Sequence, residues 1–235
     1  MLAILTAVLS LFIFTGNAKV VKDIKLFDVV NLVGVVNETT GYHANSKAYE
    51  FTKTTGDLVA GSNVSTQFAK EAELVNQFTV KAYLLPAAGS RGGTIVFLGD
   101  AKFHAAFNVL INWKSDTNLQ VESQFLLKGI GAGVSCSFQD VNGLKRDQWL
   151  HLEVRVHIRE RLIRCQINQG SQVFFRYAGR NTNNSPFDPF PNDGKLRLAQ
   201  QYLEGQEDLP IIKDRFVGKL QDVVISFGDP NCTVI

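Results

Sequence analysis

The sequence predicts an all-β protein in which two antiparallel sheets pack face to face as a β-sandwich, with one short helix. Apolar and polar residues alternate with period two along most of the chain, as they do in half-buried strands. Clusters such as AAGSRGG, NGLKRD and NQGS separate the alternating stretches and are typical of turns. A chain of 235 residues with 45% hydrophobic and 20% charged residues fits one large globular domain.

The first element is an N-terminal apolar segment. The run Leu2–Phe14 is short for a membrane span, and the small residues around Ala18 fit cleavage before Lys19. We therefore expect a secretory signal peptide over residues 1–18 and one domain over residues 19–235. An uncleaved anchor or a core strand is the alternative. The prediction is a secreted, extracellular protein without membrane insertion.

The alternation then defines the strands. In FTVKAYLL, the residues Phe78, Val80, Ala82 and Leu84 share one face. Further strands are expected at Gly93–Gly99, Phe107–Trp113, Leu119–Leu127, Leu150–Ile158, Leu162–Ile167, Gln172–Tyr177, Lys195–Gln200 and Phe216–Phe227. Strands of this number and spacing favour two large sheets.

Three stretches depart from the alternation. The segment Ser65–Val75 has apolar residues at helical spacing and is predicted as the helix. The GIGAG stretch Gly129–Gly133 is predicted as a turn. The segment Ala178–Gly194 is rich in Pro and Asn and is expected to be a long surface loop. Acidic residues in and near this loop could bind Ca²⁺ through carboxylate oxygens, although solvated acidic loops are the favoured interpretation; they are Asp188, Asp193, Asp208 and Asp214.

Three cysteines and several sequons fit an extracellular protein. In an oxidising compartment one pair among Cys136, Cys165 and Cys232 should form a disulfide. The third cysteine is then a buried thiol or a link to another chain. Candidate glycosylation sites are Asn37, Asn63 and Asn183, with a further sequon at Asn231.

The sequence contains none of the catalytic templates that we sought. GxSxG, HExxH, P-loop and EF-hand patterns are absent, and the four histidines lack the spacing of metal ligands. A sandwich glycosidase needs paired carboxylates on one strand, whereas Glu153 stands alone. We therefore expect no enzyme, no metal site and no cofactor. A formal net charge of +2 argues against a nucleic-acid partner and leaves a local anion site as the alternative.

The segment HLEVRVHIRERLIRCQI is the best candidate for binding chemistry. If Val154 and Val156 face the core, Arg155 and His157 face outward, and the returning strand places Arg164 beside them. Guanidinium groups bind sulfate and carboxylate oxygens through paired hydrogen bonds. The expected site for an acidic polysaccharide consists of Arg155, His157, Arg159, Arg161 and Arg164, which Lys145 and Arg146 would extend. The alternative is a solvated face on which Glu153 and Glu160 neutralise part of the charge.

Residues in order along the chain resemble the N-terminal domain of thrombospondins, a laminin G-like module also found at the start of several collagens. The segment Leu26–Gly34 resembles the opening strand of that domain, and KAYEF at Lys47–Phe51 resembles its next strand. The segments QWLHLEVRV, RLIRCQI, LRLAQ and FVGKLQDVVISFGDPNC resemble its later strands. The most distinctive pattern is Phe216-x-Gly218-x-Leu220-x-x-Val223, which lies between Cys165 and Cys232.

The resemblance implies a laminin G-like, concanavalin-type jelly roll and a Cys165–Cys232 disulfide, with Cys136 left over. It also implies an extracellular matrix protein that binds heparan sulfate. Of the basic turn that family members use for heparin, only Arg91 remains here, and the region after the opening strand is nearly free of positive charge. The resulting hypothesis is a non-catalytic module that binds sulfated glycosaminoglycan and supports adhesion or matrix assembly. The alternative is a module for assembly with matrix or cell-surface proteins, and a Ca²⁺-dependent lectin is a weaker third possibility.

Overall fold

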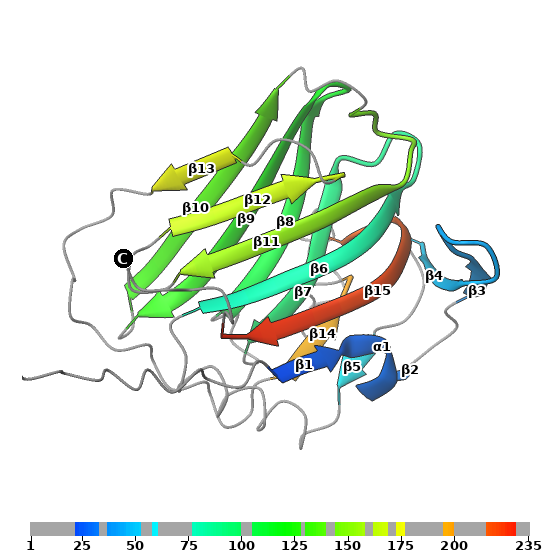
Figure 1. Ribbon diagram of the computed structural model, residues 1–235, viewed down its shortest axis with the longest axis horizontal. Helices are drawn as coiled ribbons and strands as arrows, with labels where there is room; N and C mark the ends of the chain where they lie inside the picture. Colours follow the sequence, from blue (N-terminus) through cyan, green and yellow to red (C-terminus); the bar gives the residue numbers. More distant parts are fainter. Residues whose placement is uncertain are drawn as a thin grey trace, which may run out of the picture.

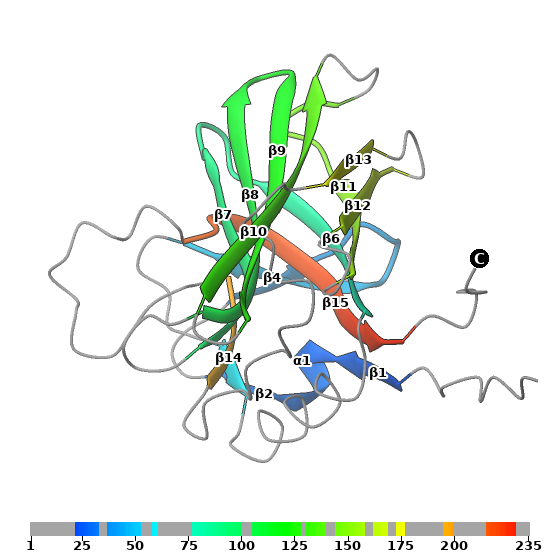
Figure 2. The ribbon, with the colours of Figure 1, turned by 90° about the vertical axis from the view of Figure 1, so that its left-hand side faces the viewer.

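The protein is a two-layer β-sandwich in a computed structural model (Figure 1). The structure describes residues 22–32, 37–52, 58–60, 77–99, 105–127, 130–139, 144–157, 162–168, 173–176, 195–199 and 215–228. Two antiparallel sheets lie against each other, and the side view separates them (Figure 2). The predicted fold class is confirmed.

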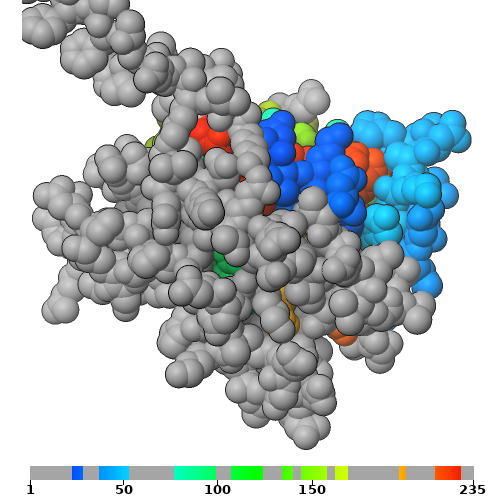
Figure 3. All heavy atoms as spheres, turned by 90° about the horizontal axis from the view of Figure 1, so that it is seen from below, coloured from blue at the N-terminus to red at the C-terminus, as the bar shows by residue number. Residues whose placement is uncertain are grey.

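Within these ranges, the first sheet has eight strands in the order β13-β12-β11-β6-β15-β4-β3, and β1 also pairs with β15. Its strands are β1 (Lys22–Lys25), β3 (Asn37–Thr40), β4 (Lys47–Phe51), β6 (Gln77–Pro86), β11 (Leu150–His157), β12 (Leu162–Ile167), β13 (Val173–Arg176) and β15 (Gly218–Phe227). Seen from below, β1 and the short helix α1 (Leu26–Val29) lie beside β15, next to β3 and β4 (Figure 3). The long strands β6, β11 and β15 therefore form the middle of this layer.

Among the described residues, the second sheet has seven strands in the order β10-β9-β8-β7-β14-β5-β2. Its strands are β2 (Val30–Leu32), β5 (Leu58–Ala60), β7 (Gly92–Gly99), β8 (Ala105–Ser115), β9 (Asn118–Leu127), β10 (Ile130–Gln139) and β14 (Lys195–Leu198). Strands β7 to β10 follow one another as antiparallel neighbours, as strands that are close in sequence often do.

The core lies between the sheets and is built from the inward half of each alternating strand. Phe78 of β6 and Phe107 of β8 meet across the layers, with ring centroids 4.2 Å apart in an edge-to-face arrangement. Along β6 the predicted face of Phe78, Val80, Ala82 and Leu84 is buried throughout. The period-two pattern thus places the core correctly.

The outcome for individual elements is mixed. The strand predictions from residue 78 onward each coincide with an observed strand to within one or two residues at most ends. The expected strand Leu26–Gly34 is wrong at its start, because α1 forms a helical turn in which Leu26 is fully buried. The stretch predicted as a glycine turn instead leads into β10, where Val134, Cys136 and Phe138 alternate toward the core. The helix predicted at Ser65–Val75 and the loop Ala178–Gly194 lie outside the described residues.

The glycine at position 218, in the pattern that resembles thrombospondin N-terminal domains, has a steric explanation. Gly218 begins β15 with a φ of 143°, a conformation that residues with a side chain rarely adopt. A Cβ at this position would collide with the carbonyl oxygen of Leu85 on β6. The close approach of β15 to β6 therefore requires glycine here.

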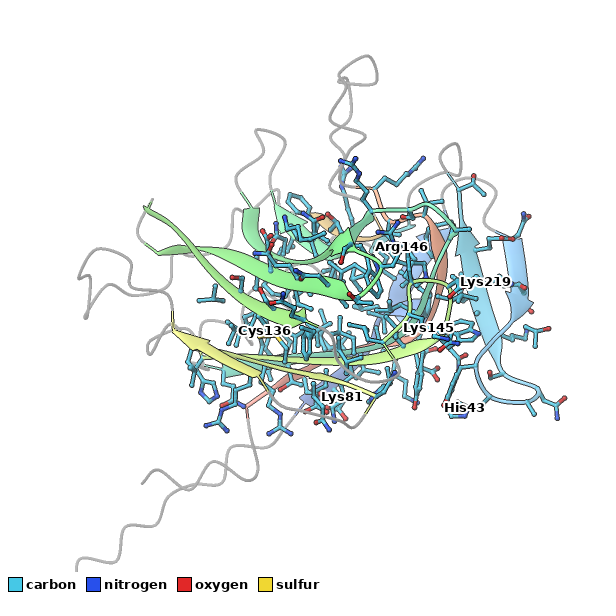
Figure 4. The ribbon with its side chains drawn as sticks, turned by 90° about the horizontal axis from the view of Figure 1, so that it is seen from above. His43, Lys81, Cys136, Lys145, Arg146 and Lys219 are labelled. Atoms are coloured by element: carbon cyan, nitrogen blue, oxygen red, sulfur yellow. A yellow bond between two sulfur atoms is a disulfide. The ribbon has the colours of Figure 1, made fainter. Side chains whose placement is uncertain are left out.

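The disulfide joins the two sheets and corrects the expected pairing. Cys136 of β10 and Cys165 of β12 are bonded, with their Cα atoms 6.2 Å apart. Both side chains point inward from strands of opposite layers, which brings their sulfur atoms together; Cys136 lies between the layers in Figure 4. The predicted Cys165–Cys232 pair is therefore wrong, and so is the proposed link from Cys136 to another chain. Cys232 itself lies outside the described residues.

Within the described residues, no helix has the length and apolar character that crossing a membrane requires.

Candidate functional site

The candidate site is the outer face of the eight-stranded sheet, meaning the side turned away from the second sheet. Along β11, Leu152, Val154 and Val156 are buried, whereas Arg155 and His157, which alternate with the two valines, are partly exposed. Figure 4 shows His43 and Lys81 on this same side of the sheet. The predicted outward register of the hairpin is thus confirmed.

Arg155 and Arg164 are the centre of the predicted anion site. They are direct cross-strand partners in the β11–β12 pairing, and Arg164 is exposed. Beside them is a small pocket of about 50 Å³, lined by Glu153, Arg155, Arg164, Cys165 and Gln166. Both arginines thus line a small pocket, and guanidinium groups suit oxygen-rich anions.

Glu153 modifies the charge of this site. Its carboxylate accepts a hydrogen bond of 2.6 Å from Nε of Arg155 and lies 3.3 Å from Nζ of Lys81. Burial raises the pKa of Glu153, but hydrogen bonds and charges from Arg155 and Lys81 outweigh burial, so the pKa lies below its usual value. The alternative interpretation of the sequence, in which Glu153 neutralises part of the arginine charge, is therefore correct for Arg155.

Other predicted site residues lie elsewhere. Arg91 follows β6 at the end where Leu84 pairs with Leu150, whereas Arg155 pairs with Thr79 near the other end. Arg146 contacts Asp116 at 3.4 Å and lies 5.8 Å from the centre of the Trp113 ring. Arg146 thus lies against β8 of the other sheet, so the expected extension of the hairpin patch by Arg146 is wrong, and the extension by Lys145 stays a prediction. Arg159 and Arg161 lie outside the described residues.

The remaining sequence candidates are only partly described. Asn37 is exposed on the edge strand β3, where a glycan has room. Asn63, Asn183 and the four aspartates considered for Ca²⁺ lie outside the described residues. In the described part of the chain, no three His, Cys, Asp or Glu residues are grouped so that they could hold a metal ion.

Sequence reasoning missed an aromatic cluster on the same outer face. Tyr42 stacks on Tyr83 with ring centroids 4.9 Å apart and an interplanar angle of 18°. His43 meets Tyr83 edge-on at 5.0 Å, and Trp149 meets Tyr42 edge-on at 6.2 Å. His151 lies 4.6 Å from Tyr83, its cross-strand neighbour. The alternation did place Tyr83 outward, but the contact with Tyr42 joins segments that are distant in sequence.

His151 connects the cluster with the charged residues of β11. Burial lowers the pKa of His151, the Glu153 carboxylate opposes that shift, and Lys81 and His43 add to it. Its backbone N–H also donates to Oδ1 of Asn168 at 2.8 Å. The backbone of His151 is therefore fixed, and the lowered pKa favours the neutral imidazole.

A buried glutamine fixes the turn that carries Tyr42. Gln221 is only 1% exposed. Its Oε1 accepts hydrogen bonds from the Tyr42 N–H at 2.6 Å and from the Ser46 hydroxyl at 3.2 Å. Gln221 begins an irregularity in the β15–β6 pairing, and the next residue, Asp222, has a φ of 48°. At this bulge the side-chain amide of Gln221 reaches the turn that carries Tyr42.

Comparisons with known proteins address the fold. No protein-family model matches the chain, and no curated protein sequence matches it. The receptor-binding domain of botulinum neurotoxin mosaic serotype C/D is similar in structure, with a TM-score of 0.53 and 10% identity over 85% of this chain and 42% of that one. Tailspike protein 2 of bacteriophage CBA120 has a TM-score of 0.51 and 11% identity over 88% of this chain and 28% of that one. The LG4-5 domains of the mouse laminin α1 chain have a TM-score of 0.40 and 12% identity over 65% of this chain and 35% of that one.

This chain thus spans less than half the length of each of these three proteins. At such identities the likeness concerns the fold alone, and the specific resemblance to thrombospondin N-terminal domains stays a prediction. The strand order and the two layers make the chain an antiparallel two-sheet β-sandwich, and the likeness to the botulinum and tailspike domains is a likeness of that fold.

Proposed function

We propose that the protein is a non-catalytic binding module that recognises sulfated glycosaminoglycan through the outer face of its eight-stranded sheet. The observation that carries the proposal is the cross-strand pair of Arg155 and Arg164 beside a small pocket. Jelly rolls host many functions, so the proposal depends on this site and not on the fold.

The chemistry of the pair suits a sulfate or carboxylate ligand. A guanidinium donates several N–H bonds in one plane, and it is less strongly hydrated than an ammonium group. Arg155 is only partly exposed and is bonded to Glu153, and Arg164 on the neighbouring strand is the more exposed of the two. We expect Arg164 to make the main contact with the anion and Arg155 to complete it.

The setting that we propose is extracellular. The N-terminal apolar segment, the sequons and the Cys136–Cys165 disulfide are all consistent with secretion. The botulinum neighbour is itself named as a receptor-binding domain, and the mouse neighbour is part of a laminin. A role in adhesion or matrix assembly is the corresponding biological proposal.

Heparin chromatography of the secreted protein tests the site. Arg164→Ala should elute at lower salt, and the slope of log affinity against log salt should fall by about one, as for loss of one contact to a polyanion. Lys114→Ala is the matched control, because Lys114 is an exposed cation on β8 of the other sheet. Equal elution of the wild type and both variants would contradict the proposal.

A further inference from the structure

We infer that Tyr42, Tyr83 and Trp149 form a stacking subsite for the apolar face of a sugar ring, on the same outer face as the arginine pair. This inference rests on the proposed function, because the sugar belongs to the same acidic oligosaccharide. It adds a second contact of a different chemical kind to the site.

The exposure of Tyr42 is the first observation. Among the residues that the structure describes, Tyr42 is the one large hydrophobic side chain that is exposed, at 51%. One face of its ring stacks on Tyr83, and Trp149 and His43 meet it edge-on. The face of an aromatic ring carries negative charge density and attracts weakly positive hydrogen atoms, including the C–H groups on one side of a pyranose.

The rigidity of the platform is the second observation. Hydrogen bonds to Gln221 hold the backbone of Tyr42, and the Ser46 hydroxyl also donates to the carbonyl of His43 at 2.6 Å. Oε1 of Gln221 and the hydroxyl of Ser46 leave no space for a Cβ at Gly41. A surface that is ordered before binding loses little conformational entropy when a ligand arrives, which favours recognition.

The position relative to the arginines is the third observation. His151, beside Tyr83, and Arg155 lie on the same row of β11, four residues apart, which is about 13 Å along a strand. Lys81 and Glu153 lie between them as a cross-strand ion pair. A ligand that reaches from the aromatic cluster to the arginine pair must span at least this distance, which suits an oligosaccharide of several sugars with anionic groups toward one end.

The test uses a size-defined heparin hexasaccharide and isothermal titration calorimetry over a series of salt concentrations. Tyr42→Ala should weaken binding by about fivefold without changing the salt dependence, because stacking involves no ion contact. Arg164→Ala should instead reduce the salt slope. Tyr42→Phe keeps the ring and should bind as the wild type does. Thermal melting checks that each variant is folded.

The outcomes separate the two proposals. If the wild type binds and Tyr42→Ala binds equally well, the stacking subsite is wrong and the arginine site stands. If the folded wild type does not bind the hexasaccharide at any salt concentration, both proposals fall. Sedimentation velocity addresses a protein occupant: a dimer that Tyr42→Ala abolishes would show that a second copy covers the aromatic cluster and would overturn the sugar subsite.

Discussion

Glu153 is the residue that links the stability of the sheet to the anion binding proposed for the outer face. It lies between Lys81 and Arg155, and its side chain is only 11% exposed. A carboxylate in this position stabilises the folded sheet, because it satisfies two cations that would otherwise repel each other. The same carboxylate weakens the positive potential that an incoming sulfate meets.

Replacing Glu153 with Gln should therefore separate these two effects. We expect the free energy of unfolding at neutral pH to fall by about 1–2 kcal/mol, as for the loss of hydrogen bonds to a charged group. Heparin elution should move to higher salt. Urea unfolding and heparin chromatography of the same preparation measure both, and a variant that is less stable but elutes earlier would contradict this account.

The pH dependence of stability gives the same variant a second test. The pKa of Glu153 is lowered in the folded state, so its contribution is fully present above the unfolded value of 4.5 and is lost as pH falls through the folded pKa. The wild type should thus lose more stability than Glu153→Gln over that acidic range. If the free energy of unfolding changes with pH in the same way for the two proteins, the ion pair contributes nothing.

Among the secondary-structure elements, β10 and β12 matter most for the connection between layers. Each carries one inward cysteine, and the bond between them spans 29 residues of chain. Closing a loop of this size in the unfolded chain corresponds to about 3–4 kcal/mol of stabilisation in the chain-entropy description. This bond ties the strand that carries Arg164 to the opposite sheet.

Removing the bond should cost most of that stabilisation. The double variant Cys136→Ala, Cys165→Ala is expected to unfold with about 3 kcal/mol less free energy than the oxidised wild type. Cys232→Ala should keep both the disulfide and the stability. Peptide mapping under non-reducing conditions checks the connectivity, and a Cys165–Cys232 peptide would contradict the structure.

The elements also show what could be predicted from the sequence. The hairpin of β11 and β12 followed from local alternation, because its partners are close in the chain. Strand β10 was missed at its glycine-rich start, and without it Cys136 had no predicted partner. The aromatic cluster depends on the contact between Tyr42 and Trp149 and on the hydrogen bond from the Tyr42 N–H to Gln221. Contacts of this range are set by the order of strands in the sheet, which alternation does not encode.

At the scale of the whole molecule, the sandwich separates a structural interior from a binding exterior on the same strands. In β6 and β11, residues of one parity fill the core and residues of the other parity form the outer face. The core can therefore stay constant while the outer face changes its ligand. The site proposed above therefore rests on the outward residues of these strands and not on the fold that the chain shares with its structural neighbours.

The facing arginines have a thermodynamic consequence for the whole domain. Like charges directly opposite each other weaken a sheet, and an anion bound between Arg155 and Arg164 would relieve that repulsion. A ligand present at a hundred times its dissociation constant adds about 2.7 kcal/mol to folding, which raises the melting temperature of a domain this size by about 5–10 °C. Sulfated oligosaccharides should produce this rise in the wild type, desulfated ones should not, and Arg164→Ala should respond less. The rise in melting temperature would then serve as an assay that compares how tightly different glycans bind.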